Sequence, residues 1–268
     1  MRALNLLRTS PHYRREAFDK GLRAIGFETV DRLDKPKPGD VLVCWNRYDG
    51  SGEVADNFER RGATVLVAEN CPLGNSWRDG AALATENLPL GNSRRDGVWY
   101  SLARRHVALT GGDINDGGAS RWDSWGVELA PFRDGNETVI LAQRGFGHPN
   151  VRSPDHWAEG VHRKIGGRIR QHPGTGPAKP LADDLRKARG VVTWSSAAAV
   201  QALTMGLPVW YAHPKFVCAE ASRPLAEFPG DPRRDDAARL KCFRRLAWAM
   251  WSLAEIESGE AIEHTLAA

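Results

Sequence analysis

The sequence lacks several features that would place it quickly in a class of proteins. Its four cysteines lie far apart without a CxxC pair, so no zinc site is expected and the thiols are predicted to be reduced. No apolar run approaches the roughly 18–20 residues that a membrane span needs. The first residues, MRALNLLRTS, carry charge and meet Pro11 too early for a secretory signal. These absences together predict a soluble, cytoplasmic protein.

Three common catalytic signatures are also missing. The chain contains no G-x-S-x-G nucleophile elbow, no H-E-x-x-H zinc motif and no P-loop. Its eight histidines are scattered, and His156 and His162 lack a convincing metal-ligand spacing. Serine hydrolases, zinc hydrolases and P-loop NTPases are therefore disfavoured, and no metal ligands are predicted.

The chain is rich in two features, positive charge and tryptophan. The 268 residues carry a formal net charge of +4, with a pI near 9.0, and include ten tryptophans. A basic balance permits an anionic partner such as a nucleotide or a nucleic acid. Tryptophan serves in cores, but also where sugars or bases stack.

The spacing of apolar residues predicts an α/β protein. Helical spacing alternates with short apolar runs along both halves of the chain, which favours parallel sheets with crossover helices. A long amphipathic helix is predicted over residues 239–257. The predicted strands are 3–7, 40–45, 63–68, 138–142, 167–170, 191–194 and 208–211. The other predicted helices are 13–25, 54–61, 156–165, 181–188 and 195–205.

A twelve-residue segment occurs twice in the first half. Residues 69–80, ENCPLGNSWRDG, recur as residues 86–97, ENLPLGNSRRDG, at an offset of 17 positions. Two copies are too few for a solenoid. A local duplication within a loop is predicted instead, because loops tolerate insertions. Which copy takes part in function stays open.

Polar residues follow three predicted strands of the second half. Ligands of open α/β sheets bind beyond the carboxyl ends of strands, and a helix N-terminus offers unpaired N–H groups to an anion. The sequence therefore predicts that a serine pair and an imidazole from the neighbouring strand hold a phosphate. The alternatives are an ordinary helix cap for the serines and a turn for His-Pro-Gly. The predicted binding residues are Gln143, Arg144, Gly145, Arg170, His172, Trp194, Ser195 and Ser196.

Two of these segments resemble the donor domain of GT-B glycosyltransferases. They are RQHPG at 170–174 and VVTWSSAAAVQALTMGLPV at 191–209. The resemblance is greatest to the capsule-polysaccharide and sialyltransferase-like branch, in which an HP motif and a serine-pair motif hold the nucleotide phosphate. The wider chain is similar to glycosyltransferase-like proteins of bacteriophages and prophages. If the chain is phage-encoded, its compartment is the host cytoplasm.

This resemblance implies an architecture and a donor. We expect two Rossmann-like domains with parallel sheets and the ligand cleft between them. Residues 1–130 would form the acceptor-side domain and 131–240 the donor domain, with 241–268 a C-terminal helix that packs back on the N-terminal domain. The donor would be a UDP- or CMP-linked sugar, with no other cofactor. GT-B enzymes stabilise the departing phosphate without a bound metal, by positive groups and N–H dipoles.

An inverting transfer also needs a carboxylate that deprotonates the acceptor hydroxyl. Three acids are candidates. Glu69 and Asp49 follow predicted strands of the first half, and Asp113 lies in a glycine-rich loop. Each is also compatible with the role of a solvated loop charge, and Glu69 begins the first copy of the duplicated segment.

The acceptor has two candidate classes. The first is a 5-hydroxymethylpyrimidine in double-stranded DNA, which the basic pI and the phage-like character favour. A flipped base would stack on an aromatic residue such as Trp45 or Trp99, with Arg104 and Arg105 on the DNA backbone. The second is a growing surface polysaccharide. A non-catalytic nucleotide- or DNA-binding protein is the alternative outside enzymes.

Overall fold

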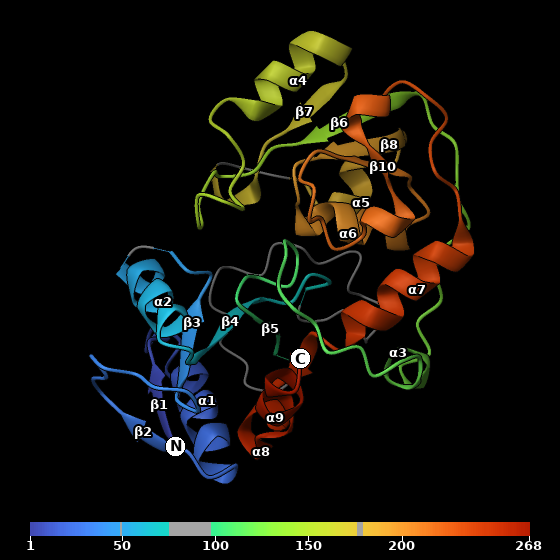
Figure 1. Cartoon of the computed structure of the whole chain (residues 1–268). Coiled ribbons are helices and arrows are strands. Elements are labelled where there is room, and N and C mark those ends of the chain that lie inside the picture. The colour runs from blue at the N-terminus through green and yellow to red at the C-terminus, as the bar shows by residue number, and fades with distance from the viewer. Residues whose placement is uncertain (49, 75–97, 176–178) are drawn as a thin grey trace. The chain divides into compact units, whose positions relative to one another are not determined.

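The computed structural model describes residues 1–48, 50–74, 98–175 and 179–268, which form two α/β units (Figure 1). The first unit holds residues 1–71, 98–117 and 246–268. The rest of the described chain forms the second unit. No helix in the described residues is long and apolar enough to cross a membrane.

A six-stranded sheet organises the first unit, in the order β11-β5-β4-β3-β1-β2. The strands β1 to β4 are parallel, whereas β5 pairs antiparallel with β4 and β11 pairs antiparallel with β5. The expected parallel pairing is thus confirmed for four strands, and the two at one edge reverse it. These strands are β1 (Arg2–Asn5), β2 (Glu28–Val30), β3 (Val41–Trp45), β4 (Thr64–Asn70), β5 (Trp99–Arg104) and β11 (Met250–Ser252).

Helices cover both faces of this sheet, which explains the uninterrupted apolar run of β3. Val41 and Val43 face a core shared with α1, α8 and α9, whereas Leu42 and Cys44 face α2. At Gly21, a Cβ atom would lie 1.9 Å from the carbonyl oxygen of Ile256, so α1 and α8 cross in close contact. The helices are α1 (His12–Ala24), α2 (Gly50–Arg60), α8 (Leu253–Ser258) and α9 (Glu260–Leu266).

The second unit has a five-stranded, wholly parallel sheet in the order β10-β9-β8-β6-β7. From β6 the chain moves to β7 on one side, then crosses back to β8 on the other. The order therefore reverses between β6 and β8, and open α/β sheets bind ligands at such a point. The strands are β6 (Glu137–Leu141), β7 (Arg168–Arg170), β8 (Ala188–Thr193), β9 (Val209–Tyr211) and β10 (Arg223–Pro224).

Helices of the second unit bury apolar stripes against this sheet. Helix α4 packs Ala158 and Val161 on Ile140, Val192 and Trp210. The predicted helix 181–188 ends earlier, because Ala188 already begins β8. The helices are α3 (Ser120–Ser124), α4 (Trp157–Ile165), α5 (Leu181–Asp184), α6 (Ala197–Thr204) and α7 (Asp236–Ala247), with short 3-10 turns at Pro173–Thr175, Ala219–Ala221 and Leu225–Glu227.

The C-terminal region differs most from the sequence-based expectation. The single helix predicted over 239–257 is wrong, because α7 ends at Ala247 and β11 follows before α8 begins. The open edge of β5 accounts for this break, since Trp251 pairs with Tyr100 there and becomes fully buried. The region that returns to the first unit is thus β11, α8 and α9 rather than one helix.

The chain changes unit at 117/118 and 245/246, compared with the predicted 130/131 and 240/241. Contacts before residue 130 explain the first difference. Trp122 stacks on Phe243 of α7 with ring centroids 5.0 Å apart, and the N–H of Ala130 donates to the carbonyl of Thr204 at 2.9 Å. Residues 118–130 therefore pack with the second unit.

Candidate functional site

The serine pair lies at the carboxyl end of β8, where the strand order reverses. The Ser195 N–H donates to Oε1 of Gln143, which follows β6, at 2.9 Å, and the Ser196 N–H donates to Oγ1 of Thr193 at 2.8 Å. Ser196 caps α6, because its Oγ accepts from the N–H of Ala198 at 3.2 Å. The hydroxyl of Ser195 has no hydrogen-bond partner among the described residues. Gln143 and Ser195 therefore join the two strands that flank the reversal point.

His172 lies on the far side of β6 from this pair. It follows β7, and β6 separates β7 from β8 in the sheet. The expectation that His172 and the serines follow neighbouring strands is therefore wrong. Two strand spacings place the ends of β7 and β8 about 9–10 Å apart. A ligand that touches both has to extend across the end of β6, past Gln143 and Arg144.

The ring of His172 is held in one tautomer. Its Nδ1 accepts from the N–H of Gly174 at 2.9 Å, so the neutral ring carries its proton on Nε2. Burial lowers the pKa of His172 to about 4, and Arg144 and Arg170 add to the effect. Near neutral pH this imidazole is a hydrogen-bond donor and not a cation.

This lowered pKa predicts acid sensitivity. Below its ordinary pKa of about 6.5, a histidine with a lowered folded-state pKa binds more protons in the unfolded state. Its contribution to stability is therefore complete above about pH 6.5 and is lost as the pH falls toward 4. In His172→Asn, Oδ1 replaces Nδ1 as acceptor without titrating. We expect urea denaturation to show a smaller loss of unfolding free energy in this variant between about pH 7 and pH 4.5. Equal losses in both proteins would contradict the assignment.

Arg170 and Trp194 make contacts inside the second unit. The buried guanidinium of Arg170 pairs with Asp184 at 2.8 Å and donates to the carbonyl of Lys179 at 3.1 Å. The indole N–H of Trp194 donates to the carbonyl of Val151 at 3.0 Å. Both residues stay predicted donor contacts, and the structure gives each a supporting role beside the site.

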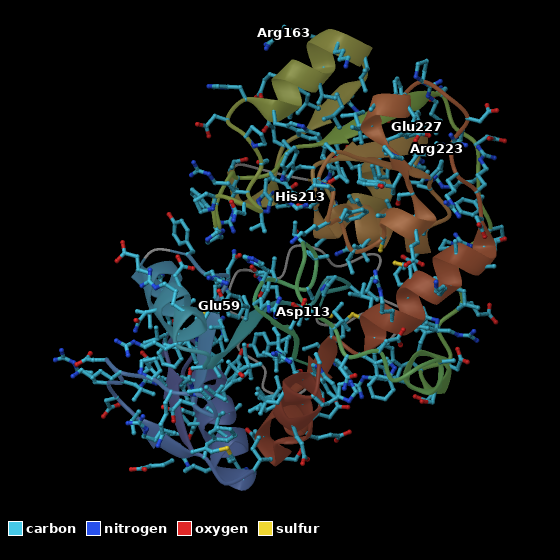
Figure 2. The ribbon with its side chains drawn as sticks, viewed as in Figure 1. Glu59, Asp113, Arg163, His213, Arg223 and Glu227 are labelled. Carbon is cyan, nitrogen blue, oxygen red and sulfur yellow. The ribbon has the colours of Figure 1, made fainter. Side chains whose placement is uncertain are left out.

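His213 is a supporting residue that the sequence did not indicate (Figure 2). Its Nε2 donates to the carbonyl of Asn150 at 3.0 Å, because Nδ1 accepts from the N–H of Lys215 at 3.1 Å. Burial lowers the pKa of His213, which favours this neutral form. The ring also packs edge-on against Trp194, with centroids 5.4 Å apart. Together these residues hold the segment after β6 over the carboxyl edge of the sheet.

Three predicted residues of the first unit share the carboxyl edge of its parallel strands. Glu69 lies near the end of β4, Trp45 ends β3, and Trp99 begins the antiparallel β5 at the same edge. The guanidinium of Arg14 stacks over the Trp45 ring at 4.2 Å. Oε1 of Glu69 accepts from the N–H of Asn70 at 2.9 Å.

The structure does not bring Arg104, Arg105 and Asp113 to that edge. Because β5 is antiparallel, Arg104 pairs with Leu66, whereas Ser101 pairs with Glu69. Three residues of strand put Arg104 about 10 Å farther along the sheet than Glu69. Asp113 (Figure 2) pairs with Arg105 at 3.2 Å near this opposite end. Asp49 and most of the duplicated segment lie outside the described residues.

Comparison with known proteins identifies the architecture. No family model matches the chain, and no curated protein matches it. Two similar solved structures are of Thermosulfurimonas dismutans KpsC. The beta Kdo 2,7 transferase is 12% identical, covers 97% of this chain and 98% of its own, and has a TM-score of 0.51. The beta Kdo 2,4 transferase is 13% identical, with coverages of 92% and 89% and a TM-score of 0.52. The chain has the GT-B fold. At these identities the likeness is one of fold.

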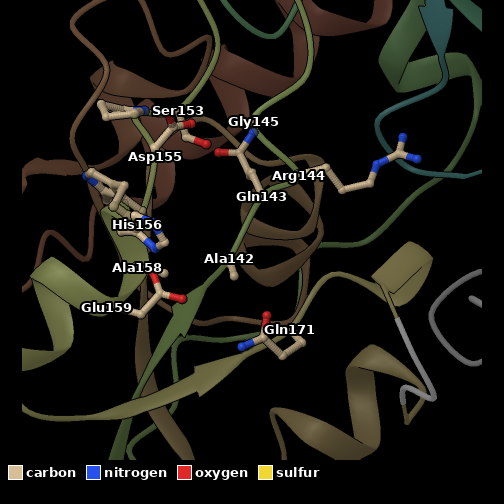
Figure 3. Close-up of a pocket in the computed structure, with 12 residues that line it drawn as sticks. Ala142, Gln143, Arg144, Gly145, Ser153, Asp155, His156, Ala158, Glu159 and Gln171 are labelled. Atoms are coloured by element: carbon tan, nitrogen blue, oxygen red, sulfur yellow. The ribbon is translucent and has the colours of Figure 1, made fainter.

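A cavity of about 230 Å³ opens beside the end of β6, within the second unit of this GT-B fold (Figure 3). Sequence patterns indicated only Gln143, Arg144 and Gly145 of its lining, because the others come from a loop and a helix start without a known motif. Among the described residues, no group of three or more His, Cys, Asp or Glu side chains is placed to hold a metal ion. The lining residues are Ala142, Gln143, Arg144, Gly145, Ser153, Pro154, Asp155, His156, Trp157, Ala158, Glu159 and Gln171.

Proposed function

We propose that the protein is a nucleotide-sugar-dependent glycosyltransferase that holds its donor at the reversal point of the second unit. The observation that carries the proposal is the bridge from Gln143 to the Ser195 N–H, where β6 and β8 diverge. Ligands of doubly wound sheets bind at this position. The likeness to two Kdo transferases supports a transferase on this fold.

The site would bind phosphate through neutral donors and one cation. The hydroxyl of Ser195 and the Nε2 proton of His172 lie on opposite sides of the β6 end, so they would contact different oxygens of an extended phosphate or sugar-phosphate. Arg144 would supply positive charge between them. These groups would stabilise the phosphate as the bond to the sugar breaks. We propose that the transfer needs no metal and that activity survives EDTA.

The acceptor is proposed to bind to the first unit and to lose its proton to Glu69. A saccharide hydroxyl is the acceptor that the two similar transferases favour. A 5-hydroxymethylpyrimidine in DNA is the second candidate, and the net charge of +4 is the observation in its favour. The aromatic and cationic pair of Trp45 and Arg14 suits stacking on either acceptor.

A donor-by-acceptor screen tests the proposal. The purified protein is incubated with CMP- and UDP-sugars and with either acidic oligosaccharides or hydroxymethylated DNA, and products are measured by mass spectrometry. We expect a sugar-sized mass gain on one acceptor with release of nucleotide. Ser195→Ala should abolish it without unfolding the protein, because the hydroxyl has no partner among the described residues. DNA or nucleotide binding without turnover of any donor would instead indicate a non-catalytic binding protein.

Gln143→Glu tests whether the phosphate binds beside the hydrogen bond between Gln143 and the Ser195 N–H. A glutamate keeps an oxygen that can accept from Ser195, but adds a negative charge beside the proposed phosphate. Like charges about 7 Å apart repel by about 2 kcal/mol at an effective dielectric constant of 20, so the donor Kd should rise by tens of fold. Isothermal titration calorimetry measures the change. Asn136→Asp, which adds the same charge to an exposed residue directly before β6 at the opposite edge of the sheet, serves as the matched charge control. Unchanged donor affinity in Gln143→Glu would place the phosphate elsewhere.

A further inference from the structure

Two of the four cysteines lie side by side in the second unit, although they are 24 positions apart in the sequence. Cys218 precedes the 3-10 turn Ala219–Ala221, and Cys242 lies in the second half of α7. Their sulfur atoms are 2.7 Å apart. Unbonded heavy atoms pack at roughly 3.5–4.0 Å, and a disulfide bond is about 2.05 Å long. A small movement would therefore bring the two sulfurs within bonding distance.

Contacts on either side of the two sulfurs hold α7 against the segment between β9 and β10. The guanidinium of Arg245 donates to the carbonyl of Val217 at 2.6 Å, and Lys241 forms an ion pair with Glu220 at 3.1 Å. On each of the two segments, these contacts lie before and after the cysteine. The short distance between the sulfurs thus follows from how α7 packs, and not only from the rotamer of one side chain.

The two thiols are buried, with 0% of Cys218 and 2% of Cys242 exposed. Burial raises the pKa of the Cys218 thiol, and the neighbouring Cys242 adds to the effect. Because the thiolate is the reactive species, such a thiol exchanges slowly in the folded protein. We expect oxidation to occur while this segment is open, or before the second unit has finished folding.

We propose that Cys218 and Cys242 form a disulfide bond when the chain meets an oxidising low-molecular-weight disulfide such as oxidised glutathione. One thiolate attacks oxidised glutathione and releases one glutathione as a mixed disulfide forms. The thiolate of the other cysteine then attacks the protein sulfur of that mixed disulfide and releases the second glutathione. The two cysteines lose two protons and two electrons, which reduce oxidised glutathione to two molecules of glutathione. This inference does not depend on the proposed function.

The other two cysteines are too far apart to form such a bond. Cys44 lies opposite Val67 in the pairing of β3 with β4. Asn70 ends β4 three residues farther on, about 10 Å along the strand, and Cys71 follows it. Disulfide-bonded cysteines have Cα atoms at most about 7 Å apart. Because Cys44 and Cys71 are also buried free thiols, they control for oxidation that does not depend on proximity.

The disulfide would tie α7 to the segment after β9. The loop that it closes runs from position 218 to position 242 and includes β10. Closing a loop of this size restricts the unfolded chain, so the disulfide should raise the midpoint of thermal unfolding by roughly 5–10 °C. Since the chain leaves the second unit at 245/246, the tether would hold the last helix of that unit in place.

A redox titration tests the assignment. The purified full chain is equilibrated in a series of reduced and oxidised glutathione mixtures, once from the native state and once by refolding from urea. Free thiols are then blocked with iodoacetamide, and the digested peptides are identified by mass spectrometry. We expect a linked peptide that joins Cys218 to Cys242 in mixtures in which Cys44 and Cys71 are still alkylated. Thermal unfolding of the same samples should show the rise in midpoint.

Cys242→Ala and Cys71→Ala are the matched variants, because each removes one buried thiol. Oxidised glutathione should raise the unfolding midpoint of Cys71→Ala as it does that of the wild type, and should leave that of Cys242→Ala unchanged. Absence of the linked peptide from every mixture overturns the proposal, and so does linkage of Cys218 to Cys44 or Cys71 in comparable amounts. A linked peptide without a rise in the midpoint overturns the tether.

Discussion

Glu69→Gln should lower kcat by about 10²-fold to 10⁴-fold, the usual contribution of a general base. The donor Kd should change little, because Glu69 belongs to the first unit and the proposed donor contacts belong to the second. Glutamine keeps the oxygen that accepts from the Asn70 N–H at 2.9 Å, so the end of β4 should keep its shape. Steady-state kinetics with saturating donor measures the first effect, and calorimetry measures the second.

Asp113→Asn is the informative companion variant. Asp113 pairs with Arg105 near the opposite end of the first sheet, about 10 Å beyond the register position of Glu69. We expect kcat to be nearly unchanged in this variant. A large loss in Asp113→Asn with full activity in Glu69→Gln would reverse the assignment of the base.

Arg239→Met should lower the free energy of unfolding by about 2–4 kcal/mol. The guanidinium is buried and donates to the carbonyls of Ala130 and Leu203 at 2.8 and 3.0 Å. It also lies over the ring of Phe132 at 4.3 Å. Methionine retains much of the apolar packing but leaves the Ala130 carbonyl without this donor, and a buried unsatisfied group costs about 1–3 kcal/mol. Loss of the contact with Phe132 adds about 0.5–2 kcal/mol.

Arg244→Met on the same helix is the matched control. Arg244 makes two hydrogen bonds to Asp123, but both side chains are well exposed. Exposed ion pairs contribute about 0–1 kcal/mol. Chemical denaturation of the two variants should therefore show a clear difference in unfolding free energy. Similar losses in both would show that the buried contacts of Arg239 carry little of the stability.

Local sequence patterns were sufficient to predict most strands and the helix start at which the proposed donor site lies. The run Val41–Trp45 is apolar on both faces because helices cover both faces of the sheet. Such a run predicts a buried strand even when the neighbouring strands are unknown. The serine pair after β8 was likewise predictable, because a buried strand followed by Ser195 and Ser196 is a typical helix start.

Features that depend on which strands become neighbours could not be read in this way. The separation of His172 from Ser195 follows from the placement of β6 between β7 and β8. The antiparallel direction of β5 moves Arg104 away from Trp45, although no local pattern marks that direction. Trp251 continues a helical pattern of apolar residues in the sequence. In the structure it lies in β11 instead, because β11 pairs with the otherwise open edge of β5. The cavity beside the end of β6 is lined by a loop and a helix start that no sequence motif connects.

The return of the chain to its first unit has a consequence for biosynthesis. Trp251 and Ile256 fill the core beside Phe18 and Leu22, and β11 covers the edge of β5. A ribosome therefore makes the second unit before the residues that complete the first. Until those residues emerge, the nascent first unit has an unpaired edge on β5 and exposes the apolar side chains that Trp251 and Ile256 later cover. Unpaired strand edges and exposed apolar surface promote aggregation and are features that chaperones bind.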